Sequence, residues 1–404
     1  MHSHAHPHAL HHEVPTLRIA VVGTGFLART RARCWERVHG ARVELVAVGT
    51  SREKAEAFMR AHACAAAATV DEALADPSIA LVDLCVPNRV HRELCERAAA
   101  AGKHVLCTKP LAAFWGQGLA GDATAEAVAA TDRAEMLARA VADADAMTAA
   151  CARAGVSLFY GENWIFAPAI RRAAALAAAS KGAILEMRGW ESHSGSHSPY
   201  AKDWRATGGG ALLRLGAHPI GAMLWLKRRE GLRLRGRETR AVAVTAEVAD
   251  LSHAAPVDAC AVARGWNGCE NWGTAIIHFD DGSRGVAYGS DCMLGGMQSH
   301  LTILASDHRF ECALSPVDGL RAYAPAEGVF GNSYIMEKVH GQAGWSTPIP
   351  DEEWHSGQQG LVQSVAEDLA TGRAPESDGT LGAEVVRIVY SAYRSAAEGR
   401  RIAL

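Results

Sequence analysis

The chain has 404 residues, and its 41 lysines and arginines against 44 aspartates and glutamates give a formal net charge of −3 at pH 7. Apolar residues make up 49% and charged residues 21%, which excludes a wholly disordered chain and suits two or three domains. The balanced charge leaves no electrostatic footprint for nucleic acid. Since no apolar stretch reaches the roughly 20 residues of a membrane helix, we expect neither nucleic acid nor a membrane as partner.

The N-terminus and the cysteines favour a cytoplasmic protein. The apolar run 19–28 contains two glycines and precedes Arg29, which is untypical of a signal peptide. Ten cysteines occur without a C-x-x-C pair, so we expect reduced thiols. Six of the first 12 residues are histidine. We interpret residues 1–16 as a disordered tail, although such a tract can also bind metal.

From residue 17 to residue 160, apolar runs of strand length alternate with segments of helical spacing. The expected strands are 17–22, 43–48, 80–86, 104–107 and 156–160. The expected helices are 26–38, 52–63, 91–101 and a longer one with Thr131 as N-cap and Gly155 as stop. This alternation predicts an α/β domain, a doubly wound Rossmann sheet of parallel strands. Residues 112–130 interrupt the rhythm, and their composition does not decide between a lid and an oligomer arm.

The pattern changes after residue 160. Alternating runs at 274–279 and 283–288 flank Asp280-Asp281-Gly282, which is a hairpin signal. Further extended runs lie at 241–248 and 301–304. We expect an α+β domain over 161–404 with a large, mostly antiparallel open sheet. Its last helix, about 382–398, should pack back on the body.

A glycine-rich turn follows the first expected strand and opens the first helix. It reads Gly23-Thr24-Gly25-Phe26-Leu27-Ala28, which fits the fingerprint G-x-G-x-x-G/A. Gly23 permits the tight turn, Gly25 lets the backbone approach a pyrophosphate, and Ala28 allows close helix–strand packing. We therefore expect a dinucleotide to contact Gly23, Thr24, Gly25, Phe26 and Leu27. The alternative is a glycine turn without a ligand.

The end of the second strand bears on the choice between NAD and NADP. NAD sites usually place an acidic residue there, whereas this chain has Gly49-Thr50-Ser51-Arg52. Small hydroxyls beside an arginine suit a 2′-phosphate, which slightly favours NADP. We assign Thr50, Ser51 and Arg52 to an NAD(P) site. The alternative is that Arg52 only begins the next helix.

Four segments, in this order, carry a family resemblance: Val86-Pro-Asn-Arg-Val-His91, Ala101-Gly-Lys-His-Val-Leu-Cys-Thr-Lys-Pro-Leu111, Gly208-Gly-Gly-Ala-Leu-Leu-Arg-Leu-Gly-Ala-His218 and Tyr393-Arg-Ser-Ala-Ala-Glu-Gly-Arg400. Together they resemble the Gfo/Idh/MocA oxidoreductases over about residues 17–400. The resemblance implies a nicotinamide-dependent enzyme acting mostly on sugars or cyclitols. It also implies a Rossmann domain at 17–160, a substrate-binding and oligomerisation domain at 161–404, and a homodimer or homotetramer.

The resemblance assigns roles to individual residues. Lys109 matches the lysine beside the substrate hydroxyl and nicotinamide, where an ammonium lowers the pKa of the reacting hydroxyl. His218 matches the histidine that bonds the same hydroxyl or acts as acid/base. Pro87, Asn88 and His91 match the loop that contacts the nicotinamide side of the cofactor. Lys109 and His218 are thus the expected catalytic residues.

Three positions depart from the family pattern. Thr108, which we assign with Lys109 to the cofactor site, replaces a Glu, while Arg214 and Gly221 replace two Asp residues that are common in the family. If 211–226 is a helix, Arg214 and His218 share one face. A fixed cation cannot act as a base but suits a carboxylate, phosphate or sulfonate, which points to an anionic substrate. The alternative is that Arg214 pairs with a neighbouring acid.

The densest polar segment outside the tail spans 189–205, shortly before the Gly208–His218 motif. We expect it to form a loop at the mouth of the substrate cleft. Its candidate substrate contacts are Glu191, His193, His197, Tyr200 and Lys202. The two histidines have the i, i+4 spacing of a helical zinc site, but the Ser-Gly-Ser between them and the proline after them argue against a helix. No metal is expected.

Glu162 and Asn163 follow the fifth expected strand, and ligands bind at the carboxyl ends of strands in open parallel sheets. Asn163 is a candidate contact for nicotinamide or substrate. Glu162 is a candidate acid/base that replaces a missing Asp. The tryptophans within 268–272 and 345–354 suit sugar platforms, although core packing explains isolated tryptophans more often.

Three functions compete. The first is a dehydrogenase or reductase that moves a hydride between nicotinamide and a substrate carbon while Lys109 and His218 manage the hydroxyl proton. The second is a redox-neutral glycosidase or lyase, in which transient oxidation acidifies a neighbouring C–H and permits elimination. The third is a non-catalytic dinucleotide-binding sensor, against which the presence of both Lys109 and His218 argues.

Overall fold

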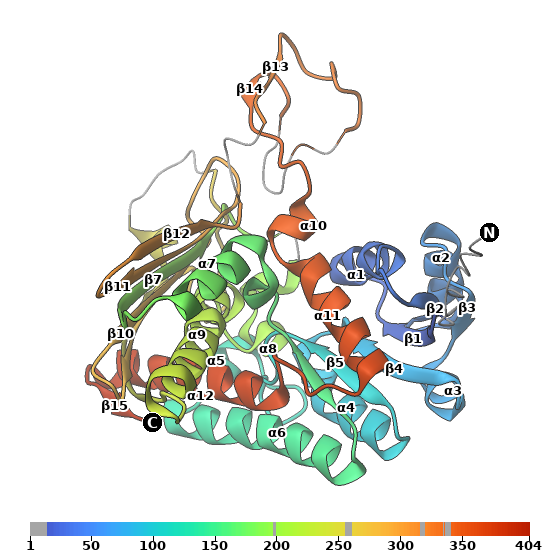
Figure 1. Cartoon of the computed structure of the whole chain (residues 1–404), viewed down its shortest axis with the longest axis horizontal. Helices are drawn as coiled ribbons and strands as arrows, with labels where there is room; N and C mark the ends of the chain where they lie inside the picture. The colour runs from blue at the N-terminus through green and yellow to red at the C-terminus, as the bar shows by residue number, and fades with distance from the viewer. Residues whose placement is uncertain (1–13, 197–198, 255–260, 316–319, 334, 336–340) are drawn as a thin grey trace, which may run out of the picture.

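The computed structural model describes residues 14–196, 199–254, 261–315, 320–333, 335 and 341–404. Two sheets, each with its own helices, lie side by side (Figure 1). The histidine-rich tract at residues 1–13 lies outside the described residues. Within the described part, no helix is both long and apolar enough to cross a membrane.

The first sheet has six parallel strands in the order β3-β2-β1-β4-β5-β6. Its strands are β1 (Thr16–Val22), β2 (Arg42–Val48), β3 (Ala66–Ala68), β4 (Ile79–Leu84), β5 (His104–Thr108) and β6 (Leu158–Gly161). Its helices are α1 (Phe26–Glu36), α2 (Arg52–Ala61), α3 (Val70–Ala75), α4 (His91–Ala100), α5 (Ala125–Ala129) and α6 (Arg133–Ala154). This is the strand order of dinucleotide-binding Rossmann domains, so the predicted doubly wound sheet is confirmed.

The sequence pattern did not predict strand β3, helix α3 or the residue that caps α6. Strand β3 consists of three alanines, which give no strand signal and pair only because β2 lies beside them. Helix α3 follows at once, with Thr69 and Glu72 forming a capping box. The N-cap of α6 is Asp132, not Thr131, because its carboxylate accepts hydrogen bonds from the N–H groups of Ala134 (2.9 Å) and Glu135 (3.2 Å).

The second sheet has seven strands in the order β12-β11-β7-β10-β9-β8-β15. They are β7 (Ile184–Ser192), β8 (Ala241–Ala249), β9 (Trp272–Phe279), β10 (Arg284–Ser290), β11 (Gln298–Ala305), β12 (Arg309–Ala313) and β15 (Ile402–Ala403). Only β7 and β10 pair in parallel, so the mostly antiparallel sheet is confirmed. The predicted hairpin joins β9 to β10.

Helices cover one face of this sheet (Figure 1). They are α7 (Pro168–Ala179), α9 (Ala217–Arg235) and α12 (Gly379–Glu398), with short helices α8 (Trp204–Thr207) and α10 (Glu352–His355) nearby. Helix α12 packs on β8 and also on α6, as predicted for the last helix. Strands β13 (Ala322–Ala324) and β14 (Gly344–Ser346) form a hairpin that stands away from the body (Figure 1).

The chain returns to the first sheet through α11 (Gln358–Thr371), which packs on α1. Two ion pairs join α10 and its N-cap to the end of α1, Arg33 with Glu353 at 2.6 Å and Arg37 with Asp351 at 2.5 Å. Residues that follow β6 line a cleft bounded by α1, α10 and the second sheet, while Lys109, which follows β5, lines a smaller cavity. Ligands of doubly wound sheets bind at the carboxyl ends of the strands.

Candidate active site

The glycine turn has the geometry that a dinucleotide needs. Gly23 has a φ of 122°, and a Cβ there would lie 2.3 Å from the carbonyl oxygen of Cys85, so only glycine fits. Gly25 begins α1 without a side-chain cap, and a Cβ there would meet nothing within 4 Å. Uncapped N–H groups beside open space fit a pyrophosphate. Ala28 is fully buried, as close helix–strand packing requires.

The end of β2 shows what Ser51 and Arg52 do in this structure. Ser51 caps α2 by accepting a hydrogen bond from the N–H of Lys54 at 3.3 Å. Arg52 is the first residue of α2, and its guanidinium binds both the Glu72 carboxylate and the carbonyl oxygen of Ala67 (3.1 Å). Thr50 is exposed. The alternative reading, in which Arg52 begins the helix, describes this geometry.

The loop after β4 lies beside Lys109. Pro87, Asn88, Lys109 and His91 line a cavity of about 430 Å³. The Asn88 amide donates to the carbonyl oxygen of Thr207 at 2.5 Å. The ring of His91 is fully buried, with its nitrogens 2.9 to 3.2 Å from the carbonyl oxygens of Val86, Pro110 and Leu111. These bonds make His91 a brace between the two loops. Thr108, the last residue of β5, is buried.

The central feature of the cleft is a buried pair formed by His218 and Glu162. Nδ1 of His218 lies 2.9 Å and 3.2 Å from the two carboxyl oxygens of Glu162. The ring stacks on Trp164 at a centroid distance of 6.0 Å, and the N–H of Trp164 donates to Glu162 at 3.0 Å. No hydrogen bond to Nε2 occurs among the described residues, which leaves this nitrogen for a ligand.

Gly221 makes room for this pair. A Cβ at Gly221 would lie 2.9 Å from Cγ of Glu162 and 3.0 Å from its Oε2. The Glu162 carboxyl therefore fills the space over α9 that a side chain at 221 would take. The absence of a side chain at Gly221 thus leaves room for the acid at the end of β6.

Burial sets the charge of the pair. The pKa of His218 is lowered to about 3, first by burial and then by the positive charge of Lys109. Burial also raises the pKa of Glu162 well above its usual range, against the opposing effect of Lys109. Both shifts disfavour the charged form of each group. The positive charge of Lys109 acts on both groups.

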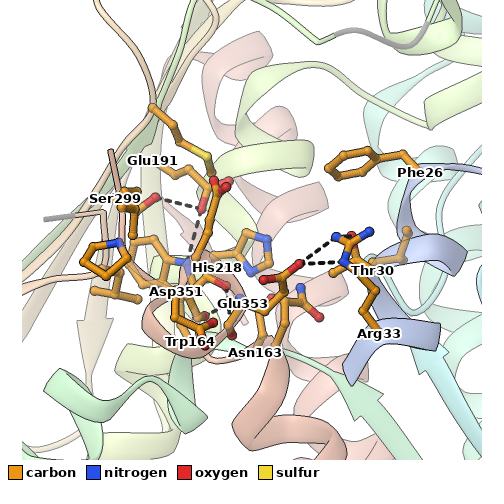
Figure 2. Close-up of a pocket in the computed structure, with 18 of the residues that line it drawn as sticks. Phe26, Thr30, Arg33, Asn163, Trp164, Glu191, His218, Ser299, Asp351 and Glu353 are labelled. Atoms are coloured by element: carbon orange, nitrogen blue, oxygen red, sulfur yellow. Dashed lines mark hydrogen bonds and ion pairs between the residues drawn. The ribbon is translucent and has the colours of Figure 1, made fainter. Parts of the chain in front are cut away.

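His218 opens into a cavity of about 740 Å³ that reaches from the second sheet to α1. Figure 2 shows His218 and Glu191 on one side of it, with Phe26 and Arg33 on the other. Glu191 is buried and accepts hydrogen bonds from Trp164 Nε1 (3.2 Å) and from a serine hydroxyl (3.4 Å).

Residues of α1, and Asn163 just after β6, line the other parts of this cavity. Phe26 is 60% exposed, and both it and Leu27 line the cavity. Asn163 also lines it and donates to the carbonyl oxygen of Ser356 at 2.6 Å. The cavity is thus bounded by residues from both parts of the chain.

Arg214 does not present a free guanidinium to this cleft. It binds Asp291, which is fully buried, and its side chain is 13% exposed. His193, also buried, lies with Nδ1 3.3 Å from the other oxygen of Asp291. The alternative in which Arg214 pairs with an acid describes this geometry.

The segment 189–205, expected as a loop, is only partly one, because residues 189–192 end β7, Pro199–Lys202 form a 3-10 turn and α8 begins at Trp204. Tyr200 is 68% exposed and lines the smaller cavity, whereas the Lys202 ammonium binds the carbonyl oxygen of Arg264 and lies 5.9 Å from the Trp266 ring. His197 lies outside the described residues. Among the described residues, no cluster of three or more His, Cys, Asp or Glu side chains could hold a metal.

Several residues of the cleft were not found from the sequence. They are Met297, Ser299 and the segment 349–358, and the sequence also did not reveal Asp291 as the partner of Arg214. Asp291 follows a strand, as Glu162 does, which is the one signal that could have found it. Met297 and Ser299 adjoin or begin β11, and 349–358 reaches the cleft only because α11 packs on α1.

Comparisons with known proteins agree with this geometry. A family model described as "Oxidoreductase family, NAD-binding Rossmann fold" matches residues 17–135, and the "GFO/IDH/MocA C-terminal domain" matches residues 171–311. The crystal structure of GenD2 from gentamicin A biosynthesis in complex with NAD is 26% identical and superposes with a TM-score of 0.77, covering 97% of each chain. Levoglucosan dehydrogenase in complex with NADH and levoglucosan is 19% identical, with a TM-score of 0.69 over 96% of this chain and 99% of that one. It shows the fold alone.

Curated relatives match over shorter stretches. D-apiose dehydrogenase of Paraburkholderia graminis is 30% identical over 155 residues, which are 38% of this chain and 34% of that protein. Inositol 2-dehydrogenase of Rhizobium meliloti is 35% identical over 97 residues, 24% of this chain and 28% of that protein. These matches span about a third or less of each relative. From its two family domains, its two sheets and its full-length structural match, the chain belongs to the Gfo/Idh/MocA family of oxidoreductases.

Proposed function

We propose that this protein is an NAD(P)-dependent dehydrogenase that oxidises a hydroxyl of a sugar or cyclitol. The observation that carries the proposal is the buried His218–Glu162 pair, which opens into a cavity that reaches Phe26 and Leu27 at the start of α1 and is acted on by the charge of Lys109. The named relatives act on apiose and inositol, which are compounds of this class. Because Arg214 is held by Asp291, we propose a neutral substrate in place of the anionic one that Arg214 suggested.

The chemistry follows from the residues. A bound nicotinamide supplies the hydride acceptor. The Lys109 ammonium stabilises the developing alkoxide of the substrate, and Nε2 of His218 exchanges the hydroxyl proton. Glu162 holds the ring through Nδ1 and takes part of the charge that the ring gains. Trp164 fixes the plane of the imidazole by stacking.

For the cofactor, we propose NAD over NADP, which reverses the preference drawn from the sequence. Arg52 is already bound to Glu72, and a 2′-phosphate would have to displace that carboxylate. The family description names NAD, and the GenD2 structure contains NAD.

The test is to incubate the protein with NAD and with D-apiose, levoglucosan and myo-inositol, and to measure NADH and sugar product together. The proposal expects one NADH per product, and loss of this activity in Lys109→Ala but not in Lys181→Ala, where an exposed lysine is removed. Product without NADH would support the redox-neutral alternative. Bound NAD without turnover of any member of a wide polyol panel would support the sensor.

A further inference from the structure

The position of Lys109 depends on Arg214. Lys109 follows β5, and its ammonium donates a hydrogen bond to the backbone carbonyl of Arg214. Arg214 lies in η4 (Leu212–Gly216), a π-helical turn that runs directly into α9 and His218. Such turns are frequent at functional sites, where they free backbone groups that a regular helix would keep in its own hydrogen-bond ladder. The same segment thus carries His218 and anchors Lys109.

Arg214 is in turn fixed by Asp291. Asp291 follows β10 directly, is fully buried, and has its N–H bonded to the carbonyl oxygen of Asn271 at 2.8 Å. Its carboxylate binds the Arg214 guanidinium. The guanidinium carbon also lies 5.5 Å from the centre of the Trp266 ring. Asp291, at the end of a strand of the second sheet, therefore fixes the turn to which Lys109 is hydrogen-bonded.

The charges around this arrangement come from several elements. The positive charge of Lys109, which follows β5, acts on His218 on α9 and on Glu162 at the end of β6. Asp291 faces Arg214 from η4 and His193 from the end of β7.

Arg214 also acts on Glu270, which precedes β9 and whose pKa is raised by burial. Glu270 is bonded to the N–H groups of Gly210 and Leu212 at 2.9 Å. Arg214 and Asp291 form a close pair of opposite charges within this group. Removing one member leaves the other buried and uncompensated near the Lys109 anchor.

We propose that Arg214 and Asp291 are a positioning pair for Lys109. The pair fixes the Lys109 ammonium in its cavity, and the opposite charges of its two members add almost no net charge beside that ammonium. The arginine that departs from the family pattern then acts through Lys109. The catalytic consequence rests on the proposed function, but the effect on the lysine does not. It is therefore tested on Lys109 itself.

The experiment labels the full chain with a trace of acetic anhydride across a pH series and reads acetylation of Lys109 by peptide mass spectrometry. Only the neutral amine reacts, so the midpoint of the labelling curve reports how readily Lys109 loses its proton. The exposed Lys181 gives an internal reference in every sample. No substrate is needed, so the result is independent of whether the dehydrogenase proposal holds.

The two single substitutions should move the midpoint in opposite directions. Asp291→Asn removes the negative charge beside Arg214 and should lower the midpoint by about one pH unit, whereas Arg214→Gln removes the positive charge beside Asp291 and should raise it by about the same amount. Arg214→Lys, and the double variant R214Q/D291N, keep the charge balanced and should remain near the wild-type midpoint. Asp143→Asn, which removes the partner of Arg92, is the control for loss of an unrelated pair.

A merely structural role would not give opposite shifts. Equal midpoints in all variants, or shifts of the two single variants in one direction, would overturn the inference. Circular dichroism identifies a variant that has not folded; if Asp291→Asn is lost in this way, Arg214→Gln and the double variant still decide. An active Lys109→Ala protein would overturn the proposed function while leaving opposite shifts intact, so the two failures are distinguishable.

Discussion

At the scale of single residues, the departure at Gly221 is linked to the position of Glu162. Gly221 lacks the side chain that would fill the space over α9, and the Glu162 carboxyl fills it instead. Sequence reasoning could propose Glu162 because it follows a parallel strand, where ligands gather. It could not propose Asp291 as the partner of Arg214, because 77 positions separate them and only the second sheet brings them together.

The choice between NAD and NADP also depends on single residues. Glu72→Gln releases Arg52 from its carboxylate partner, so the preference for NADP over NAD, measured as the ratio of kcat/KM values, should rise about fivefold. The factor is small because both side chains are half exposed. Arg52→Ala is the control and should not gain NADP activity. An unchanged ratio in Glu72→Gln would show that Arg52 does not approach the 2′ position.

At the scale of elements, periodicity gave the long helices and the buried strands because their apolar positions repeat regularly. It failed where a neighbour decides the structure. Strand β3 has no apolar pattern and exists because β2 pairs with it. The start of α6 offered two adjacent capping residues, and sequence alone does not show which side chain reaches the helix N–H groups.

The capping assignment is testable. Asp132→Ala removes the acceptor of two helix N–H groups and should lower the free energy of unfolding by about 1 kcal/mol in urea denaturation. Thr131→Ala is the matched control and should cost much less. A larger loss in Thr131→Ala than in Asp132→Ala would restore the cap expected from the sequence.

At the scale of the whole molecule, the second sheet has one face covered by helices and one bare face (Figure 1). The bare face presents a cluster of large side chains from β7, β9 and β10: Trp190, Trp272, Ile276, Val286 and Tyr288. Register places Ile276 against Val286 and Trp190 against Tyr288. A continuous apolar sheet face is usually covered by another layer.

We propose that a second copy of the chain covers this face, as the family resemblance suggests. Ile276 is 39% exposed near its centre, so Ile276→Glu should convert a homodimer or homotetramer into smaller species in light scattering after gel filtration. Leu176→Glu, at a comparably exposed position on α7, should leave the mass unchanged. A wild-type monomer, or equal effects of both substitutions, would contradict the proposal.

The central claim is that Glu162 supplies the acidic partner of His218. The most direct measurement compares kcat for NADH formation in Glu162→Ala with kcat in the double variant E162A/G221D, which returns a carboxylate to α9. We expect a loss of about 100-fold or more in the single variant and partial recovery in the double variant. Wild-type kcat in Glu162→Ala would contradict it.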